Sequence, residues 1–238
     1  SSVKGGHWTG GLIGISGGWG GDGPVRMNIT IKDCSVTYST IEGKGSVGGI
    51  IGHSINDANT ASTITGVTVQ NNNITSTGSS KVKAGAVMGT VGVATTTLDA
   101  DVSLNIVKSG GTTTPGIYGR FGSTGSTLAI VGGSYDCGVK APEVASTLAV
   151  SGGTFAEAVP AEYIVEGYEI SKNDNGTYSV DEMAPVAKIG DTEYKYLDKA
   201  LAAAKDGDTV TIIADITVTD TLNVPLKSIT LKAADGVK

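Results

Sequence analysis

The stretch Gly48-Gly49-Ile50-Ile51-Gly52 carries the pattern that decides the fold, because it recurs along the chain. The same glycine-framed apolar pentad begins at Gly10 and, with alanine in second place, at Gly85, so its starts are separated by nearly equal intervals. A shorter relative follows at 116–119. Near-constant spacing indicates a repeat architecture, in which each unit buries its apolar face by stacking on the next.

Two further repeats support stacking. In the first, four apolar positions recur together further along the chain at one offset: Ile31, Cys34, Val36 and Ile41 match Ile64, Val67, Val69 and Ile74. The uneven step inside each set predicts a bulge or corner at Lys32-Asp33 and at Thr65-Gly66. The pentads are spaced slightly more widely than these positions, which predicts a four-residue insertion after Ile74, within 78–81.

The third repeat is tighter and links 126–135 with 146–155. We therefore expect a coil of about 20 residues. The wider spacings of the other two repeats would then correspond either to one coil with an inserted loop or to nearly two short coils. Because strands of successive coils pair in parallel, equivalent residues should lie above one another. The predicted stacked pairs are Leu128 with Leu148, Ile130 with Val150, and Tyr135 with Phe155.

Composition favours β structure and excludes several partners. The 238 residues include 36 glycines and 6 prolines, and only 17% are charged. The net charge is −6, and the arginines are Arg26 and Arg120 alone, so no basic cluster favours nucleic acid. No apolar run reaches the roughly 18 residues of a membrane span. Cys34 and Cys137 fit no metal spacing, and five coils between them would leave two free, buried thiols.

The pattern changes after about Pro160. Asn175-Gly176 between alternating segments predicts a hairpin. Apolar residues at helical spacing predict a short helix over 197–205, with Gly207 as its C-cap. Strands are expected at 187–189, 193–196, 209–213 and 216–218, while Ile229, Leu231 and Val237 look like a strand whose partner lies beyond the chain.

Together these features predict an all-β chain: a right-handed parallel β-helix over 1–160, a terminating β-hairpin over 161–183, and a small β unit over 184–238 that begins a second β-helix. An antiparallel β-sandwich is the alternative fold. We expect the chain to be part of a longer polypeptide.

The pentads resemble the GLUG motif of large bacterial adhesins and surface proteases. Gly152-Gly153-Thr154-Phe155 through Asn175-Gly176-Thr177-Tyr178 resembles a module in surface proteins of gut anaerobes. Ile189-Gly190-Asp191 and 196–210 resemble the opening of a pectin-lyase-like β-helix. The resemblance implies extracellular display and adhesion or polysaccharide contact, with no catalytic residues in these motifs; the fold alone does not set function.

Candidate chemistry is sparse. Carboxylates that could cleave sugars are Asp33 and the pairs Asp99/Asp101 and Asp206/Asp208, but solvated loops and turns explain them better. Asparagine runs at 71–73 and 173–175 offer oxygens for calcium, although turn bonding accounts for both. His7 and His53 are interpreted as loop or corner residues. Threonine runs at 95–97, 112–114 and 209–211 are not in register with one another.

Trp8 and Trp19 are the weak candidates for ligand binding, because aromatic faces stack on sugars; capping of the first coil is the simpler interpretation. We expect no catalytic residue, metal or cofactor. The leading hypothesis is a non-catalytic surface or secreted module, adhesin-like or a stalk, that contacts a glycan or a host extracellular protein. A polysaccharide-active enzyme or a carbohydrate-binding module is the rival. A long groove with two carboxylates and a base would favour the rival; smooth Ser/Thr-coated faces would favour the spacer or adhesin.

Overall fold

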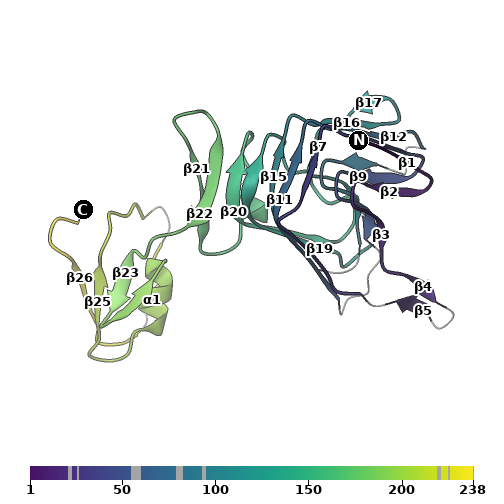
Figure 1. Ribbon diagram of the computed structural model, residues 1–238. Coiled ribbons are helices and arrows are strands. Elements are labelled where there is room, and N and C mark those ends of the chain that lie inside the picture. The colour runs from purple at the N-terminus through teal and green to yellow at the C-terminus, as the bar shows by residue number, and fades with distance from the viewer. Residues whose placement is uncertain are drawn as a thin grey trace. The chain divides into compact units, whose positions relative to one another are not determined.

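The computed structural model describes residues 1–20, 23–25, 27–54, 60–78, 83–92, 95–218, 221–224 and 226–237. The chain is mostly β and divides into two compact units, Ser1–Asp181 and Glu182–Lys238. The first unit is a stack of in-register parallel sheets, the arrangement of a parallel β-solenoid (Figure 1). No helix among these residues has the length and apolar character that a membrane crossing requires.

The longest sheet, here sheet I, holds two of the three sequence repeats. Its parallel strands are β6 (Ile29–Lys32), β7 (Ser35–Thr37), β11 (Ala61–Gln70), β15 (Thr95–Ser103), β19 (Thr127–Tyr135) and β20 (Thr147–Phe155). The register confirms the predicted pairs Leu128 with Leu148 and Ile130 with Val150. The Tyr135 and Phe155 rings also stack, with centroids 5.1 Å apart. Parallel pairing rules out the sandwich alternative for this unit.

The predicted bulge is present. Asp33 and Gly66 have positive φ angles of 52° and 61°, and the register between β11 and β15 shifts between Ile64 and Val67. A left-handed residue at this point turns the strand so that Val67 returns to the interior, where it is 1% exposed. The uneven apolar spacing in the sequence is therefore the mark of this bulge.

Three shorter sheets complete the full coils. Sheet II consists of β1 (Ser2–Gly5), β8 (Thr40–Gly43), β12 (Asn73–Ser76) and β16 (Ile106–Ser109), with β17 (Thr112–Thr113) antiparallel at its edge. Sheet III consists of β2 (Trp8–Gly10), β9 (Ser46–Gly48) and β13 (Ala84–Gly85). Sheet IV consists of β3 (Ile13–Ser16), β10 (Ile51–Ser54), β14 (Met88–Val91) and β18 (Tyr118–Phe121).

One full coil is longer than the sequence repeats suggested. The chain visits sheets I, II, III and IV once before it returns to sheet I, so a full coil runs from Ile31 to its partner Ile64. The tighter repeat belongs to the last coil, β19 to β20, in which only the sheet I strand remains.

The predicted insertion lies between Ser76 and Ala84. Thr40 of β8 pairs with Asn73 of β12, whereas Val47 of β9 pairs with Ala84 of β13. The interval in the second pair is four positions longer, so the extra residues enter the chain after β12 and before β13.

The pentads form the tight turn from sheet III to sheet IV. Gly49 N–H donates to Ala86 O at 3.0 Å, and Ile50 N–H donates to Val87 O at 2.9 Å, so the turns stack from coil to coil. The shorter relative continues the stack, because Val87 N–H donates to Ile117 O at 2.8 Å. Glycine is required because the two sheets approach so closely that a Cβ on Gly89 would lie 2.4 Å from Val47 N.

A buried asparagine ladder holds the corner between sheets I and II. Asn72 Nδ2 donates to Val36 O at 2.8 Å and to Asn105 Oδ1 at 3.0 Å, while Ser39 N–H donates to Asn72 Oδ1 at 2.9 Å. Asn105 Nδ2 in turn donates to Val69 O at 2.7 Å. Each asparagine side chain thus hydrogen-bonds to backbone groups of the preceding coil, which have no strand partner at this corner.

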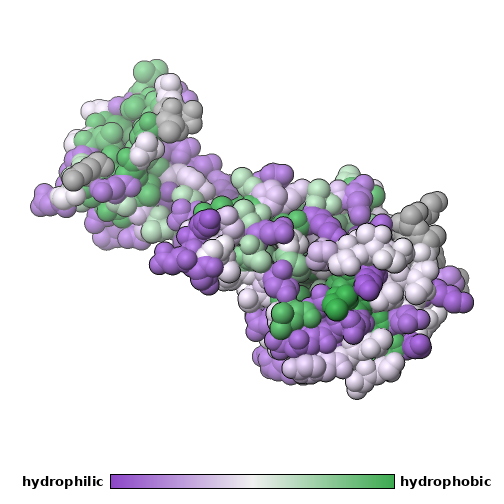
Figure 2. Space-filling model, turned by 90° about the horizontal axis from the view of Figure 1, so that it is seen from above, coloured by the Kyte–Doolittle hydropathy of each residue, from purple (hydrophilic) through white to green (hydrophobic). Residues whose placement is uncertain are grey.

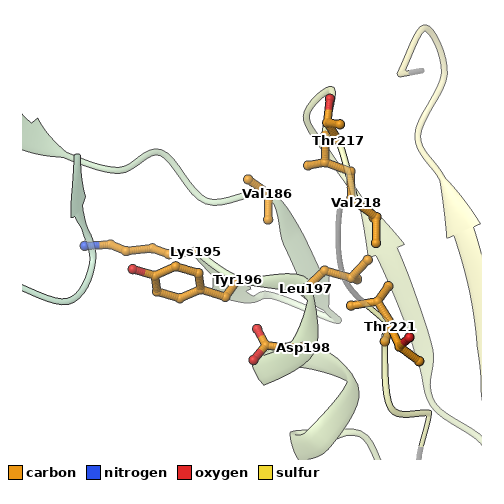
Figure 3. Close-up of a pocket in the computed structure, with 10 residues that line it drawn as sticks. Val186, Lys195, Tyr196, Leu197, Asp198, Thr217, Val218 and Thr221 are labelled. Atoms are coloured by element: carbon orange, nitrogen blue, oxygen red, sulfur yellow. The ribbon is translucent and has the colours of Figure 1, made fainter. Parts of the chain in front are cut away.

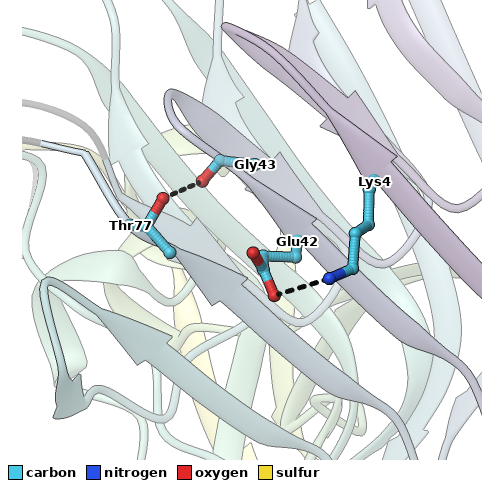
Figure 4. Close-up of polar contacts among 4 residues, drawn as sticks. All are labelled: Lys4, Glu42, Gly43 and Thr77. Carbon is cyan, nitrogen blue, oxygen red and sulfur yellow. Dashed lines mark hydrogen bonds and ion pairs between the residues drawn. The ribbon is translucent and has the colours of Figure 1, made fainter.

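Polar side chains also meet between coils on sheet II. Lys4 Nζ lies 3.9 Å from Glu42 Oε2, and Thr77 Oγ1 donates to Gly43 O at 3.2 Å (Figure 4). The Lys4 and Glu42 side chains are 71% and 41% exposed, so this ion pair contributes little to stability.

The last coil is covered by an antiparallel hairpin. The 3₁₀ helix Ala161–Tyr163 leads to β21 (Tyr168–Lys172) and β22 (Tyr178–Glu182), and β22 pairs with β20. Gly176, with a φ of 86°, closes the predicted Asn-Gly turn. Because β22 runs antiparallel to β20, it ends the parallel stack on sheet I.

The second unit pairs four strands with one helix. The elements are β23 (Ala187–Ile189), β24 (Thr192–Tyr194), α1 (Leu197–Ala203), β25 (Thr209–Ile212) and β26 (Thr230–Ala233). Three details were predicted wrongly. Ala204, not Gly207, caps the helix; 216–218 is not a strand; and β26, expected to lack a partner, pairs in parallel with β25.

Candidate functional site

The predicted carboxylates hold turns or face outward from the long sheet. Asp206 Oδ1 accepts from Ser228 N–H at 2.9 Å, and Asp208 Oδ2 accepts from Lys205 N–H at 2.7 Å. Asp99 and Asp101 alternate with buried residues on β15 and form no ion pair with a described residue. Turn hydrogen bonds therefore account for Asp206 and Asp208, and Asp99 and Asp101 face outward together from β15 without a described ion-pair partner.

The asparagine runs are occupied with structural hydrogen bonds. Asn71 has a φ of 56°, as expected for a left-handed turn residue, and Asn72 is the centre of the ladder. Asn173 Nδ2 donates to Thr177 Oγ1 at 3.0 Å within the hairpin. Among the residues that the structure describes, no group of three or more His, Cys, Asp or Glu side chains has the arrangement of a metal site.

Trp8 lies at the start of sheet III and keeps 45% of its surface exposed. Its ring meets that of His53 edge-on, with centroids 5.6 Å apart, and that of His7 at 6.2 Å. His7 lies in a bend, as expected, but the interpretation of His53 as a loop or corner residue was wrong, because His53 lies in β10; both rings contact Trp8. Trp19 is in β4 (Gly18–Gly20), which pairs with β5 (Gly23–Val25), and its side chain lies outside the described residues.

His53 belongs to a series of side-chain pairs between sheets III and IV. Beside the Trp8–His53 contact, Ser46 Oγ and Thr90 Oγ1 are 2.6 Å apart. Burial, followed by the charge of Arg120, lowers the pKa of His53 to about 4, so the ring is neutral at pH 7.

The cysteines are free, as predicted, but their placement differs. Cys137 is buried, and burial raises its pKa to about 12, which makes it a poor nucleophile. Cys34 is half-buried rather than buried. The two cysteines are about three coils apart, not five. Cys34 lies two residues before Val36 and Cys137 two residues after Tyr135, and Val36, Val69, Val102 and Tyr135 pair in order on successive coils.

A pocket that the sequence did not indicate opens where the coil shortens. The loop after β19 leaves a cavity of about 170 Å³, here the step pocket, lined by Pro115, Asp136, Cys137, Gly138, Val139, Lys140 and Glu157. It gathers two carboxylates and a lysine, yet Asp136 Oδ2 already accepts from Leu104 N–H. The cavity is smaller than the roughly 300–1,000 Å³ typical of ligand pockets.

A larger pocket of about 480 Å³ lies in the second unit. Figure 3 shows Val186, Leu197 and Val218 from separate segments around it, with Tyr196 and Asp198 near the start of α1. In Figure 2 hydrophobic residues gather on this unit, and Leu226 there is fully exposed. The lining is mainly apolar, with no convergent set of acids and bases among the described residues, and so fits binding better than catalysis.

The outward face of sheet I carries in-register polar columns. Thr30, Thr63 and Thr97 stack on one another, and Ser35, Thr68, Asp101, Ser134 and Thr154 form a second column. The run at 95–97 therefore does stack, although not on 112–114, which lies beside sheet II, or on 209–211 in the second unit. This face is coated mainly with Ser and Thr from β6 to β15, while on β19 and β20 the first column continues with Ala129 and Ala149.

Comparison with known proteins adds no family: no family model, no curated protein and no solved structure matches the chain.

Proposed function

We propose that this chain is a non-catalytic stretch of a secreted or surface-displayed bacterial repeat protein, adhesin-like or a stalk, that contacts a glycan or a host extracellular protein. Its solenoid is a right-handed parallel β-helix, the handedness that crossovers between parallel strands almost always take. The second unit, in which Thr209 of β25 pairs in parallel with Thr230 of β26, begins a second β-helix. The resemblance of the stacked pentads to the GLUG motif supports extracellular display.

The observation that carries the proposal is the Ser/Thr-coated outer face of sheet I. Its side chains alternate with core residues on each side of the bulge, so hydroxyl groups repeat at the rung spacing of about 4.8 Å. Such a face is rigid and well hydrated, which suits a spacer or an adhesive surface. The two carboxylates on it, Asp99 and Asp101, have no ion-pair partner among the described residues, whereas sugar cleavage needs an acid and a base with distinct roles.

Trp8 is the residue most suited to glycan contact, because a half-exposed indole near the first coil offers a stacking face. The test is a glycan and extracellular-matrix array probed with the wild-type chain and with Trp8→Ala. A signal that Trp8→Ala abolishes, with the circular dichroism spectrum retained, supports glycan binding. A signal that the variant leaves intact removes Trp8 from the site, and no signal leaves a passive stalk.

The step pocket is the observation that favours the rival function, a polysaccharide-active enzyme. It holds Asp136, Glu157 and Lys140 together, as an acid, a base and a charge stabiliser would be held. Release of reducing ends, or of unsaturated products absorbing in the ultraviolet, from a polysaccharide panel tests it. Activity lost in Glu157→Gln would establish the enzyme and overturn the non-catalytic proposal.

A further inference from the structure

We infer that residues 136–146 form a strap that closes the last strand of sheet IV, β18, to pairing with another chain. The strap is the loop between β19 and β20, where the coil becomes shorter. In place of a further coil, its side chains accept hydrogen bonds that earlier coils accept with their backbone carbonyl oxygens. The inference goes beyond the proposed function, because it concerns how the solenoid ends and not what its faces bind.

Hydrogen bonds between coils run in one direction at the corner between sheets I and II. Tyr38 N–H donates to Gln70 O at 3.1 Å, and one coil later Asn71 N–H donates to Ser103 O at 3.2 Å. Leu104 occupies the same corner on the next coil and, like Tyr38 and Asn71, has a positive φ angle. The N–H of Leu104 therefore needs an acceptor beyond the last full coil.

At Leu104 a side-chain carboxylate supplies that acceptor. β19 pairs with β15 up to Tyr135, so Asp136, the first residue of the strap, takes the position of Ser103 one coil further on. Leu104 N–H donates to Asp136 Oδ2, whereas the equivalent groups on earlier coils donate to a carbonyl oxygen. Hydrogen bonds to a carboxylate are roughly twice as strong as those between neutral groups, so this bond can hold the strap where no ladder continues.

A second carboxylate of the strap accepts a hydrogen bond from β18 itself. Gly122 N–H donates to Val91 O of the preceding coil at 2.7 Å. Because the N–H groups of a strand alternate in direction, the N–H of Phe121 points away from that coil, toward the outer edge of sheet IV. Glu143 Oε2 accepts from this N–H at 3.3 Å. A backbone group that an added strand would pair with is therefore already occupied.

Two more hydrogen bonds fasten the strap to the last full coil. Tyr118 O–H, at the start of β18, donates to Lys140 O, and Gly125 N–H donates to Ala145 O at 2.8 Å. Val139 of the strap is partly buried and packs against the hydrophobic core of the first unit. The strap therefore lies against the end of sheet IV along much of its length.

Sheets I and II end in a different way. On sheet I the antiparallel strand β22 pairs with β20, and on sheet II β17 pairs antiparallel with β16. Among the described residues no strand pairs with the outer side of β18. An uncovered edge strand offers a row of N–H and C=O groups to other chains, and natural proteins cover such edges with a loop or a helix. On sheet IV the strap supplies this cover.

The experiment removes both contacts of the strap with β18 in a Tyr118→Phe/Glu143→Ala variant of the full chain. Sedimentation velocity over a range of concentrations measures association, and amide hydrogen exchange measures protection at Phe121. We expect the variant to associate more strongly than the wild-type chain. In dilute solution, exchange at Phe121 should quicken about tenfold or more, the factor that corresponds to loss of a hydrogen bond to a charged group. At high concentration it should slow again, because another chain then pairs with β18.

Two further variants separate the strap from general effects. Glu162→Ala removes an exposed carboxylate outside the strap and should sediment and exchange as the wild-type chain does. Glu143→Gln keeps an oxygen acceptor without the charge, so it should lose only part of the protection at Phe121 and associate no more than the wild-type chain. If the double variant does not fold, as judged by circular dichroism, Glu143→Ala alone is measured in its place.

Three results would overturn the inference. Unchanged exchange at Phe121 would show that Glu143 does not hold the strap on β18. Faster exchange without stronger association would show that β18 needs no cover. Association that leaves Phe121 unprotected at high concentration would place the contact elsewhere on the chain.

Discussion

Replacing Gly89 by alanine tests whether the close approach of sheets III and IV is what the pentads provide. The added Cβ would lie 2.4 Å from Val47 N, 2.5 Å from Gly52 O and 2.8 Å from Ser46 C. Carbon contacts are normally about 3.5–4.0 Å, and all three obstacles are backbone atoms that no side-chain rotation can move. Overpacking costs about 1–3 kcal/mol and occasionally more, so we expect about 3 kcal/mol here.

The assay is thermal unfolding followed by circular dichroism, with amide hydrogen exchange to locate the effect. For a unit of this size, about 3 kcal/mol corresponds to a fall in Tm of roughly 6–12 °C. Exchange should quicken in β9, β10 and β14, because these strands border the added methyl group, and should change least in β20.

Gly6→Ala is the matched control, because a Cβ at Gly6 would meet nothing within 4 Å. Its effect should stay within about 0.5 kcal/mol. If Gly89→Ala were as harmless as Gly6→Ala, the two sheets would not be in the contact described, and the steric explanation of the pentad would be wrong.

Three further results are expected. As the pH falls from about 6.5 to about 4, the first unit should lose up to about 2 kcal/mol of stability. In this range the unfolded chain protonates His53 while burial and Arg120 keep the folded ring neutral; His53→Asn should flatten this part of a pH–stability curve. Asn72→Ala should lower the free energy of unfolding by about 3 kcal/mol, because it removes three hydrogen bonds of roughly 1 kcal/mol each. The control is Asn73→Ala on the exposed surface, and an equal loss of stability in the two variants would refute the ladder. A thiol reagent should label Cys34 first and reach Cys137 only on unfolding, because burial raises the pKa of Cys137 to about 12; equal labelling rates in the native state would contradict this.

Local features of the solenoid could be predicted because each one changes the spacing of apolar residues in the sequence. The bulge at Asp33 shows as an uneven apolar step, and the stacking of Tyr135 on Phe155 shows as a repeat at a fixed offset. The coil length could not be obtained in this way. Spacing reports how often the chain returns to one sheet, but not how many sheets it visits before returning, and here a full coil visits four.

The candidate sites were harder to predict for a related reason. Trp8 and His53 meet only because the pentad turns bring the strands of sheets III and IV together. The step pocket likewise depends on the coil becoming shorter, which places Glu157 near Lys140. In the second unit, the end of α1 was misplaced because Gly207, with a φ of 85°, serves the following turn rather than the helix.

The shortening of the last coil also bears on how the molecule carries mechanical load. Successive full coils are joined by parallel ladders in four sheets, whereas β19 and β20 are joined by sheet I alone. A pull along the solenoid axis must separate all four ladders between full coils but only one at the step. The region joined by sheet I alone, from β19 through β20 to β22, is therefore where a tethered chain should yield first, and a stalk built this way would extend there under tension while the pentad-bearing coils kept their shape.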